Sequence, residues 1–85
     1  MGSEERKKLL KQLETLITTF VETRDKITEL LNEFAEDARE AHDNMPETLQ
    51  DSERGERLSE IADAAENLAS DVESLEVEID LSEIE

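Results

Sequence analysis

The amino-acid sequence predicts an all-α protein in which two long helices fold back on each other as an antiparallel hairpin with a coiled-coil-like seam. Three observations support this fold. Apolar residues recur at alternating spacings of three and four along most of the chain. No glycine or proline interrupts residues 3–45. A turn signal at Pro46 separates two such periodic segments, and short connections make successive helices antiparallel neighbours. The sequence therefore indicates a single domain over residues 1–85.

The first helix is expected over about residues 4–44, with Ser3 placed to cap its N-terminus. Ten of its eleven seam positions are apolar, and their spacing excludes the strict alternation of a strand. The seam positions are Leu10, Leu13, Ile17, Phe20, Arg24, Ile27, Leu31, Phe34, Ala38, Ala41 and Met45. We expect the one charged member, Arg24, to extend toward acids near the end of the second helix. A role in fixing the register or oligomeric state is the alternative for this arginine.

The turn is expected over residues 45–52, because Pro46 disfavours helical geometry at the residue before it. Asp51 or Ser52 then caps a second helix over about residues 53–78, followed by a tail at 79–85. Its seam positions are Leu58, Ile61, Ala65, Leu68, Val72, Leu75 and Ile79. Folding the chain near residue 50 places Ala38 and Ala41 opposite Ile61 and Ala65. Small residues let helices approach closely, so the closed end of the hairpin is expected to be the tightest part.

The two helices have unequal lengths, which leaves part of the first helix without a neighbour. The second helix reaches back only to about residue 20. Burying one leucine side chain stabilises a protein by about 1.5–3 kcal/mol, and monomers rarely expose large apolar patches. We therefore predict a homodimer that forms a four-helix bundle. The predicted dimer interface consists of Leu9, Leu10, Leu13, Leu16, Ile17 and Phe20.

Charge is strongly polarised along the chain, whose formal net charge is −16. Residues 1–26 carry six Lys or Arg and five Asp or Glu, whereas residues 58–85 carry ten acids and no base. The basic residues near the N-terminus are expected to meet the acidic C-terminal segment of a second chain. The net charge favours a basic protein as partner and disfavours direct binding to nucleic acid or to an anionic membrane. No apolar run approaches the ~18–20 residues that a membrane crossing needs, so no membrane-spanning helix is expected.

The sequence offers no recognisable catalytic or metal-binding motif. Its one histidine is His42. A carboxylate-bridged di-metal bundle requires glutamate three residues before the ligand histidine, and this sequence has Arg39 there. There are no cysteines and no glycine-rich phosphate loop. We expect a protein without cofactor, metal or enzymatic activity, in which His42 lies favourably near the C-terminal end of a helix.

Two surface regions are the candidates for binding a partner. Carboxylates at helical spacing predict an acidic face that imitates the phosphates of a nucleic-acid duplex, or that is simply solvated. This face comprises Glu60, Asp63, Glu66, Asp71, Glu36, Asp37 and Glu40. The second region is the turn, represented by Pro46, Leu49, Arg54 and Arg57. We expect Leu49 to cover the end of the hairpin, and the two arginines to close the turn by ion pairs with Asp43, Glu47 or Asp51. The alternative is a turn that reads a partner.

The turn sequence Asn44-Met45-Pro46-Glu47-Thr48-Leu49-Gln50-Asp51-Ser52-Glu53-Arg54-Gly55-Glu56 resembles a known pattern. It is similar to the N-x-P-E-x-L-Q-x-S-E-R-G-E turn of small acidic helical hairpin proteins encoded by bacteriophages and prophages. The resemblance covers about residues 40–76 and implies a viral protein in the cytoplasm of a bacterial host. Two functions follow as hypotheses. The first is an acidic protein that docks on a basic host protein and inhibits or modulates it. The alternative is a structural or oligomerisation module.

Overall fold

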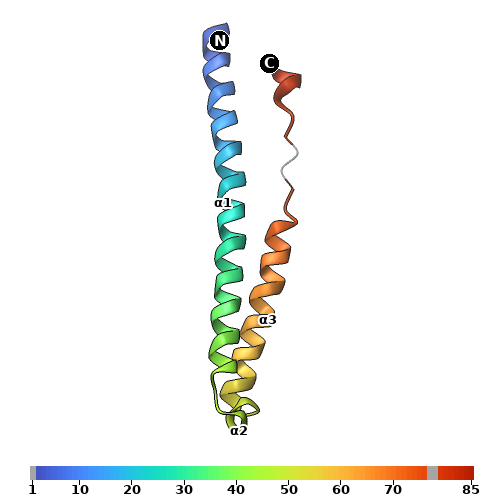
Figure 1. The fold of residues 1–85 in the computed structure, drawn as a ribbon. Helices are drawn as coiled ribbons and strands as arrows, with labels where there is room; N and C mark the ends of the chain where they lie inside the picture. Colours follow the sequence, from blue (N-terminus) through green and yellow to red (C-terminus); the bar gives the residue numbers. More distant parts are fainter. Residues whose placement is uncertain (1, 77–78) are drawn as a thin grey trace.

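The computed structural model describes residues 2–76 and 79–85 and shows a narrow, elongated helical hairpin (Figure 1). Helix α1 (Ser3–Asp43) runs almost the full length of the molecule, which measures 71 × 15 × 14 Å. The short helix α2 (Glu47–Gln50) makes the turn, and α3 (Glu53–Glu73) returns along α1. A 3₁₀ helix, η1 (Leu81–Ile84), lies beside the N-terminal end of α1. The described residues contain no strand, which agrees with the predicted all-α hairpin.

Helix α1 begins at Ser3, one residue earlier than predicted. Gly2 is the N-cap, with extended backbone geometry, and its carbonyl oxygen accepts a hydrogen bond from Arg6 N at 3.2 Å. Ser3 is already helical, so the prediction that it caps the helix is wrong. Glu4 and Glu5 in the first turn have the sign of charge that the helix dipole favours there.

The closed end of the hairpin, which we call the tip (residues 44–58), is held by hydrogen bonds from polar side chains. Gln50 Nε2 donates to the Met45 carbonyl oxygen at 3.2 Å, and Ser52 Oγ caps α3 by accepting from Gly55 N at 3.3 Å. Gly55 is buried against α2, where an added Cβ would lie 2.1 Å from the Gln50 carbonyl oxygen. The close approach of these two backbones therefore requires glycine at position 55.

The core of the hairpin consists of alanines. Ala35 and Ala38 of α1 pack in the interface with α3, where Ala62, Ala65 and Ala69 are equally buried. The most enclosed of them, Ala62, has an exposed fraction of 0%. Small side chains let the two helices approach closely, as expected for Ala38 and Ala65. Buried residues lie close to the tip, and helix-to-helix packing is tightest there.

The seam differs from the predicted one by a rotation of both helices. The residues of α1 and of the turn after it that are buried or half-buried in the seam are Leu10, Ile17, Val21, Arg24, Thr28, Leu31, Ala35, Ala38, His42 and Met45. Every second predicted position, such as Phe20 and Phe34, is instead exposed. The apolar stripe of α1 is three rows wide, and α3 packs on the two rows that contain Ala35 and Ala38. Alanine at these positions allows the closest helix contact, which phenylalanine would prevent.

Helix α3 ends at Glu73, before the predicted end near residue 78. Ser74 is the C-cap, and its Oγ donates to the Asp71 carbonyl oxygen at 2.8 Å. The last turn of α3 contains no cation, and a carboxylate at Glu73 interacts unfavourably with the negative end of the helix dipole. The predicted helical residues 77 and 78 lie outside the described residues. In the expected tail, Asp80 caps η1 by accepting from Ser82 N at 2.9 Å.

Candidate protein-interaction surfaces

One side of the hairpin carries a continuous row of exposed apolar side chains, which we call the apolar flank. Residues spaced by seven share a row along a helix, and the exposed row of α1 lies next to the buried seam. On the returning chain, Ile61, Leu68 and Leu75 form a row that also lies next to the buried seam. The large exposed residues of the flank are Leu9, Leu13, Leu16, Phe20, Ile27, Leu30 and Phe34 of α1, with Leu68, Leu75 and Ile79 from the returning chain.

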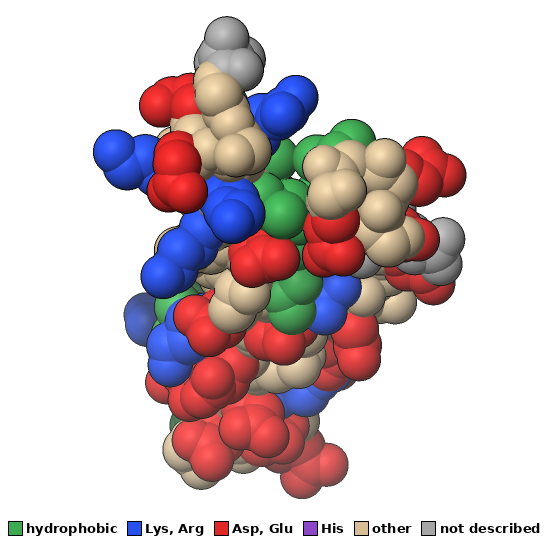
Figure 2. Space-filling view, turned by 90° about the horizontal axis from the view of Figure 1, so that it is seen from above, with side chains coloured by type: hydrophobic (Ala, Val, Ile, Leu, Met, Phe, Trp, Pro, Cys, Tyr) green, Lys and Arg blue, Asp and Glu red, His purple; other side chains and the backbone are tan. Residues whose placement is uncertain are grey.

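The two rows meet along an open groove near the middle of the molecule. Side chains of α1 and of the segment after α3 border the same groove. Its lining residues are Leu13, Leu16, Ile17, Phe20, Leu75, Glu76 and Ile79. Figure 2, which views the end that carries both termini, shows hydrophobic side chains in the space between α1 and the C-terminal segment. Monomeric proteins rarely expose contiguous apolar surface of this extent. The apolar flank is therefore the strongest candidate for contact with another protein.

The six residues of the predicted dimer interface fall into two groups in the structure, one exposed and one half-buried. Leu9, Leu13, Leu16 and Phe20 are exposed and belong to the apolar flank. The other two residues, Leu10 and Ile17, are half-buried in the seam. Leu10 lines a second hollow with Ser3, Arg6, Lys7, Ile84 and Glu85, which shows that the C-terminal segment reaches it. The prediction that all six lack a neighbour in the same chain is thus wrong for these two.

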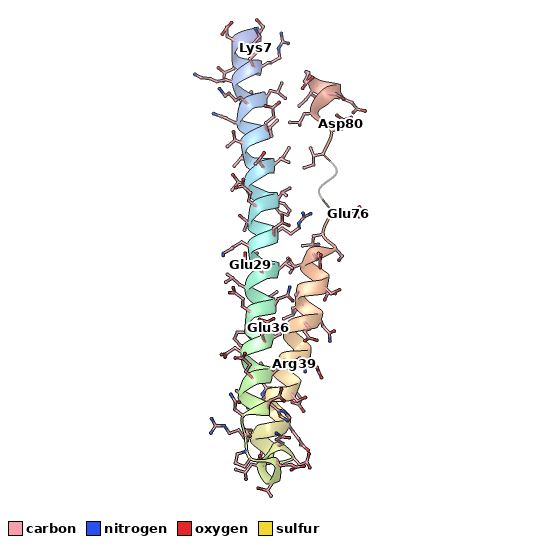
Figure 3. The ribbon with its side chains drawn as sticks, in the orientation of Figure 1. Lys7, Glu29, Glu36, Arg39, Glu76 and Asp80 are labelled. Atoms are coloured by element: carbon pink, nitrogen blue, oxygen red, sulfur yellow. The ribbon has the colours of Figure 1, made fainter. Side chains whose placement is uncertain are left out.

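We call the side of the hairpin opposite the apolar flank the polar flank. On this side, Arg39 joins α1 to α3. Its side chain reaches from α1 to α3 (Figure 3). Arg39 Nε donates to Glu66 Oε1 at 2.9 Å, and a terminal guanidinium nitrogen donates to Asp63 Oδ1 at 2.9 Å. The rotation of the seam places Arg39 beside α3. One cation therefore joins the two helices through two carboxylates.

The ion pairs of Arg39 shift the ionisation of the groups that form them. The hydrogen bond from Arg39 lowers the pKa of the Glu66 carboxyl below its ordinary value, because it stabilises the charged form. The hydrogen bonds to Glu66 and Asp63 in turn raise the pKa of Arg39. All three side chains are partly exposed, so solvent weakens these ion pairs.

The predicted acidic face does not form one surface. Asp63 and Glu66 bond to Arg39 on the polar flank, and Glu60 lies 3.6 Å from Arg57. Glu36 lies on the polar flank, whereas Asp37 and Asp71 border the apolar flank by their seven-residue spacing from Leu30 and Ala64. The remaining residue, Glu40, is exposed. Within the described residues, Glu36, Asp37, Glu40 and Asp71 form no ion pair within 4.0 Å, and their charges face solvent around the tip half of the molecule.

The contacts that hold the turn differ from the predicted ones. Arg57 pairs with Glu60, and in the part of the chain that the structure describes Arg54 has no acid within 4.0 Å. The predicted closure of the turn by Arg54 and Arg57 through Asp43, Glu47 or Asp51 is thus wrong. Pro46 is the N-cap of α2, and the side chains of Gln50 and Ser52 hold the turn instead.

A shallow hollow at the tip contains the residues that were expected to cover the end of the hairpin. It is lined by Ala41, Asn44, Met45, Pro46, Leu49, Ser52, Arg54 and Leu58. Leu49, Met45 and Leu58 thus border the same hollow, as predicted, although Leu49 remains about half exposed. Leu49 is the one large apolar side chain of this lining that is exposed to solvent among the described residues, so the hollow is a weaker candidate than the apolar flank.

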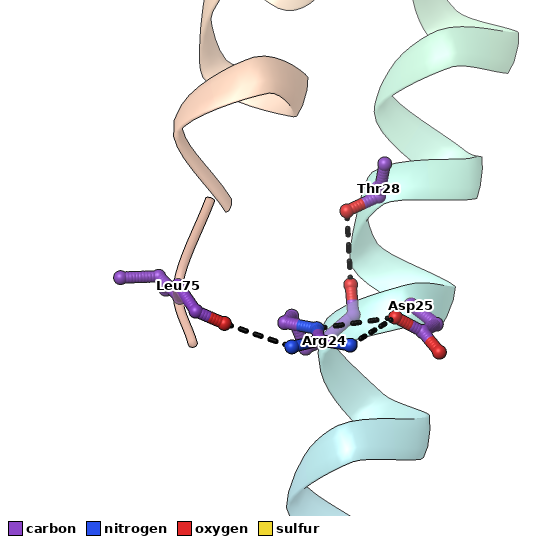
Figure 4. Close-up of polar contacts among 4 residues, drawn as sticks. All are labelled: Arg24, Asp25, Thr28 and Leu75. Atoms are coloured by element: carbon purple, nitrogen blue, oxygen red, sulfur yellow. Dashed lines mark hydrogen bonds and ion pairs between the residues drawn. The ribbon is translucent and has the colours of Figure 1, made fainter. Parts of the chain in front are cut away.

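Arg24 lies in the seam as predicted and contacts the backbone just beyond α3 (Figure 4). A terminal nitrogen of its guanidinium donates to the Leu75 carbonyl oxygen at 2.8 Å, just beyond the end of α3. Its Nε and other terminal nitrogen donate to the neighbouring Asp25 Oδ1 at 3.1 and 3.0 Å. Arg24 was placed near Glu76, Glu78 or Asp80, and of these Glu78 lies outside the described residues. The side chain therefore stabilises the C-terminal end of α3 by satisfying a carbonyl there.

The remaining titratable groups suggest no chemical site. His42 is half-buried in the last turn of α1, with Nδ1 3.2 Å from Asp43 Oδ1. Among the described residues, no three or more histidines and acids converge in a way that would hold a metal ion. Across residues 2–76 and 79–85, no helix has the length and apolar content that a membrane crossing demands.

The sequence alone did not reveal the Arg39 bridge, the role of Gln50 or the separation of the two flanks. The sequence does contain a signal for the Arg39 bridge. Alanines recur at spacings of three and four in each helix, at Ala35 and Ala38 in the first and at Ala62, Ala65 and Ala69 in the second. Choosing these alanines for the seam places Arg39 next to Glu66. The chain was also compared with protein-family models, with curated proteins and with solved structures, and none of the three comparisons found a match.

Proposed function

We propose that this protein is a non-enzymatic assembly module, a helical hairpin that associates through its apolar flank into a helical bundle. The single observation that carries the proposal is the continuous exposure of large apolar side chains on one flank. Phe34 and Leu68 are 59% and 53% exposed at the same level of the two helices as the alanine core. Each such side chain gains about 1.5–3 kcal/mol when a partner buries it fully.

The internal core supports the same proposal. Among the described residues, the five buried apolar residues are all alanines, which remove little apolar area from water. Chains of this size form marginal cores and usually need oligomerisation or another stabilising element. A second copy that covers the apolar flank would complete a four-helix bundle and supply the missing core.

Thermal unfolding at several protein concentrations tests this function. Stability that depends on association makes the melting temperature rise with concentration. We expect the melting temperature, measured by circular dichroism over a hundredfold range of concentration, to rise for the native sequence. The double variant Leu30→Ser/Phe34→Ser should melt at a lower temperature that no longer depends on concentration.

The matched control is Asn32→Ser/Glu36→Ser, which changes two exposed residues at the same level of α1 away from the apolar flank. This variant should keep the concentration dependence of the native sequence. A melting temperature of the native sequence that stays constant over the whole range would contradict the proposal.

A second function, docking on a basic host protein, is favoured by the exposed carboxylates of the tip half. Glu36, Asp37, Glu40 and Asp71 remain available to a basic partner. The resemblance of the turn to acidic phage proteins agrees with a host partner, including a nucleic-acid-binding protein that is engaged by charge mimicry. Affinity purification from bacterial lysate tests it: capture by the native sequence should be lost in high salt and in the variant Glu36→Gln/Glu40→Gln.

A further inference from the structure

Among the described residues, the N-terminal half of α1 has no α-helix beside it on its own chain. Arg24 contacts the Leu75 carbonyl just beyond the end of α3, which places this end beside the middle of α1. Beyond that level, residues 74–76 and 79–80 are not α-helical, and residues 81–84 form the short η1. Residues 9–20 therefore face only a thin C-terminal segment, although they carry Leu9, Leu13, Leu16 and Phe20 of the apolar flank.

The apolar flank is centred on Ile27. Its main row on α1 runs from Leu13 through Ile27 to Ala41 at seven-residue spacing. A two-fold axis through Ile27, perpendicular to the long axis, brings Leu13 to the level of Ala41 of a second copy. Because α3 lies beside the tip half of α1, the same operation lays α3 of that copy along the N-terminal half of α1. Antiparallel pairing thus supplies a helix where the hairpin has none, whereas parallel pairing leaves both N-terminal halves without one.

Charge favours the same arrangement. Residues 3–12 carry four bases and two acids, and Arg6 continues the row of the apolar flank seven residues before Leu13. The segment 37–60 carries eight acids and three bases. The C-terminal residues 79–85 add three acids beside the N-terminus, which leaves that end close to neutral. Parallel pairing would set two strongly acidic tips side by side, whereas antiparallel pairing sets each tip against the basic start of α1.

We infer that the exposed N-terminal half of α1 is the docking site for the acidic tip half of a second copy, so that the protein forms an antiparallel dimer. This inference rests on the proposed assembly function and adds the identity and orientation of the partner. In the dimer Leu13, Phe20 and Phe34 of one copy lie against the apolar flank of the other. Lys7 and Lys11 reach the level of Glu47 and Asp43 of the second copy.

Distances between spin labels test this orientation, because the chain contains no cysteine of its own. A single label at Gln12→Cys is exposed near the start of α1. The antiparallel dimer separates the two labels by about 30 residues along the axis, or about 45 Å at about 1.5 Å per residue. A parallel dimer would bring them within about 20 Å, since packed helices lie about 8–10 Å apart.

A label at Lys26→Cys, close to the two-fold axis, is the matched control. It should show an intermolecular distance within about 20 Å, because helices in contact lie about 8–10 Å apart. A long Gln12 distance with a short Lys26 distance supports the antiparallel dimer. Short distances at both positions would overturn the orientation and leave the assembly function intact. Long distances at both would overturn the docking site, and no intermolecular distance at either would overturn the assembly function itself.

Discussion

Arg39 of α1 and Glu66 of α3 are joined across the hairpin by a hydrogen bond of 2.9 Å between Nε and Oε1. The same guanidinium holds Asp63, so one cation fixes the polar flank of the pair. With that flank fixed, Phe34 and Leu68 lie on the opposite side and are exposed. The position of a single arginine thus identifies the side of the molecule that is free for assembly.

The Arg39–Glu66 contact predicts a pH-dependent contribution to stability. A carboxyl whose pKa is lower in the folded state stabilises the protein above its unfolded pKa, and this contribution is lost as the pH falls through the folded value. The ordinary pKa of Glu66 is 4.5, and Arg39 lowers it. In urea unfolding, the native sequence should exceed Glu66→Gln in stability at pH 7, and the difference should shrink below about pH 4.5.

The control for this experiment is Glu40→Gln, because it removes the same charge from an exposed residue. The structure gives Glu40 no ion pair within 4.0 Å among the described residues. The whole protein is strongly acidic, so its total stability changes with pH for other reasons, and only the difference between variants is diagnostic. A Glu66→Gln difference that stays constant from pH 7 to pH 3 would contradict the ion-pair assignment.

Gly55 predicts an unusually large effect for a small substitution. A Cβ at this position would lie 2.1 Å from the Gln50 carbonyl oxygen, so Gly55→Ala must displace α2 or the start of α3. We expect a loss of more than about 1 kcal/mol in the free energy of unfolding. Gly2→Ala is the matched control, since nothing lies within 4 Å of the added Cβ there. Equal stability of the two variants in urea unfolding would refute the close approach.

Arg24 is predicted to order the chain just beyond α3. Arg24→Met keeps an apolar side chain in the seam but removes the hydrogen bond to the Leu75 carbonyl. Amide hydrogen exchange at Leu75 and Ser82 should then become several-fold faster, because local opening costs less. Lys26→Met removes a charge two residues away and should leave these rates unchanged. Equal acceleration in both variants would mean that the effect arises from charge alone.

The sequence predicted the helical hairpin correctly, because periodicity and the Pro46 turn are local signals that packing does not override. It missed the rotation of the seam, because α1 has three apolar rows and periodicity alone does not rank them. The deciding factor was the close packing of Ala35 and Ala38 against the alanines of α3. Once this seam is chosen, Arg39 meets Glu66 and Phe34 faces solvent.

The candidate surfaces were predicted less well than the fold. Leu9, Leu13, Leu16 and Phe20 were identified correctly as exposed apolar residues. The full apolar flank was not, because Ile27, Leu30, Phe34 and Leu68 were assigned to the interior or to its margin. The end of α3 was also misplaced, since carboxylates near its C-terminus and the Ser74 cap stop the helix earlier than apolar spacing indicates.

The mass of the native protein in solution tests the central claim most directly. The apolar flank should drive association, so sedimentation equilibrium at tens of micromolar should give twice the single-chain mass of 9.7 kDa. The measurement should be repeated at high salt, where apolar burial is maintained and repulsion between acidic surfaces is screened. A mass of one chain at every concentration and salt level would show that the apolar flank does not mediate assembly with itself.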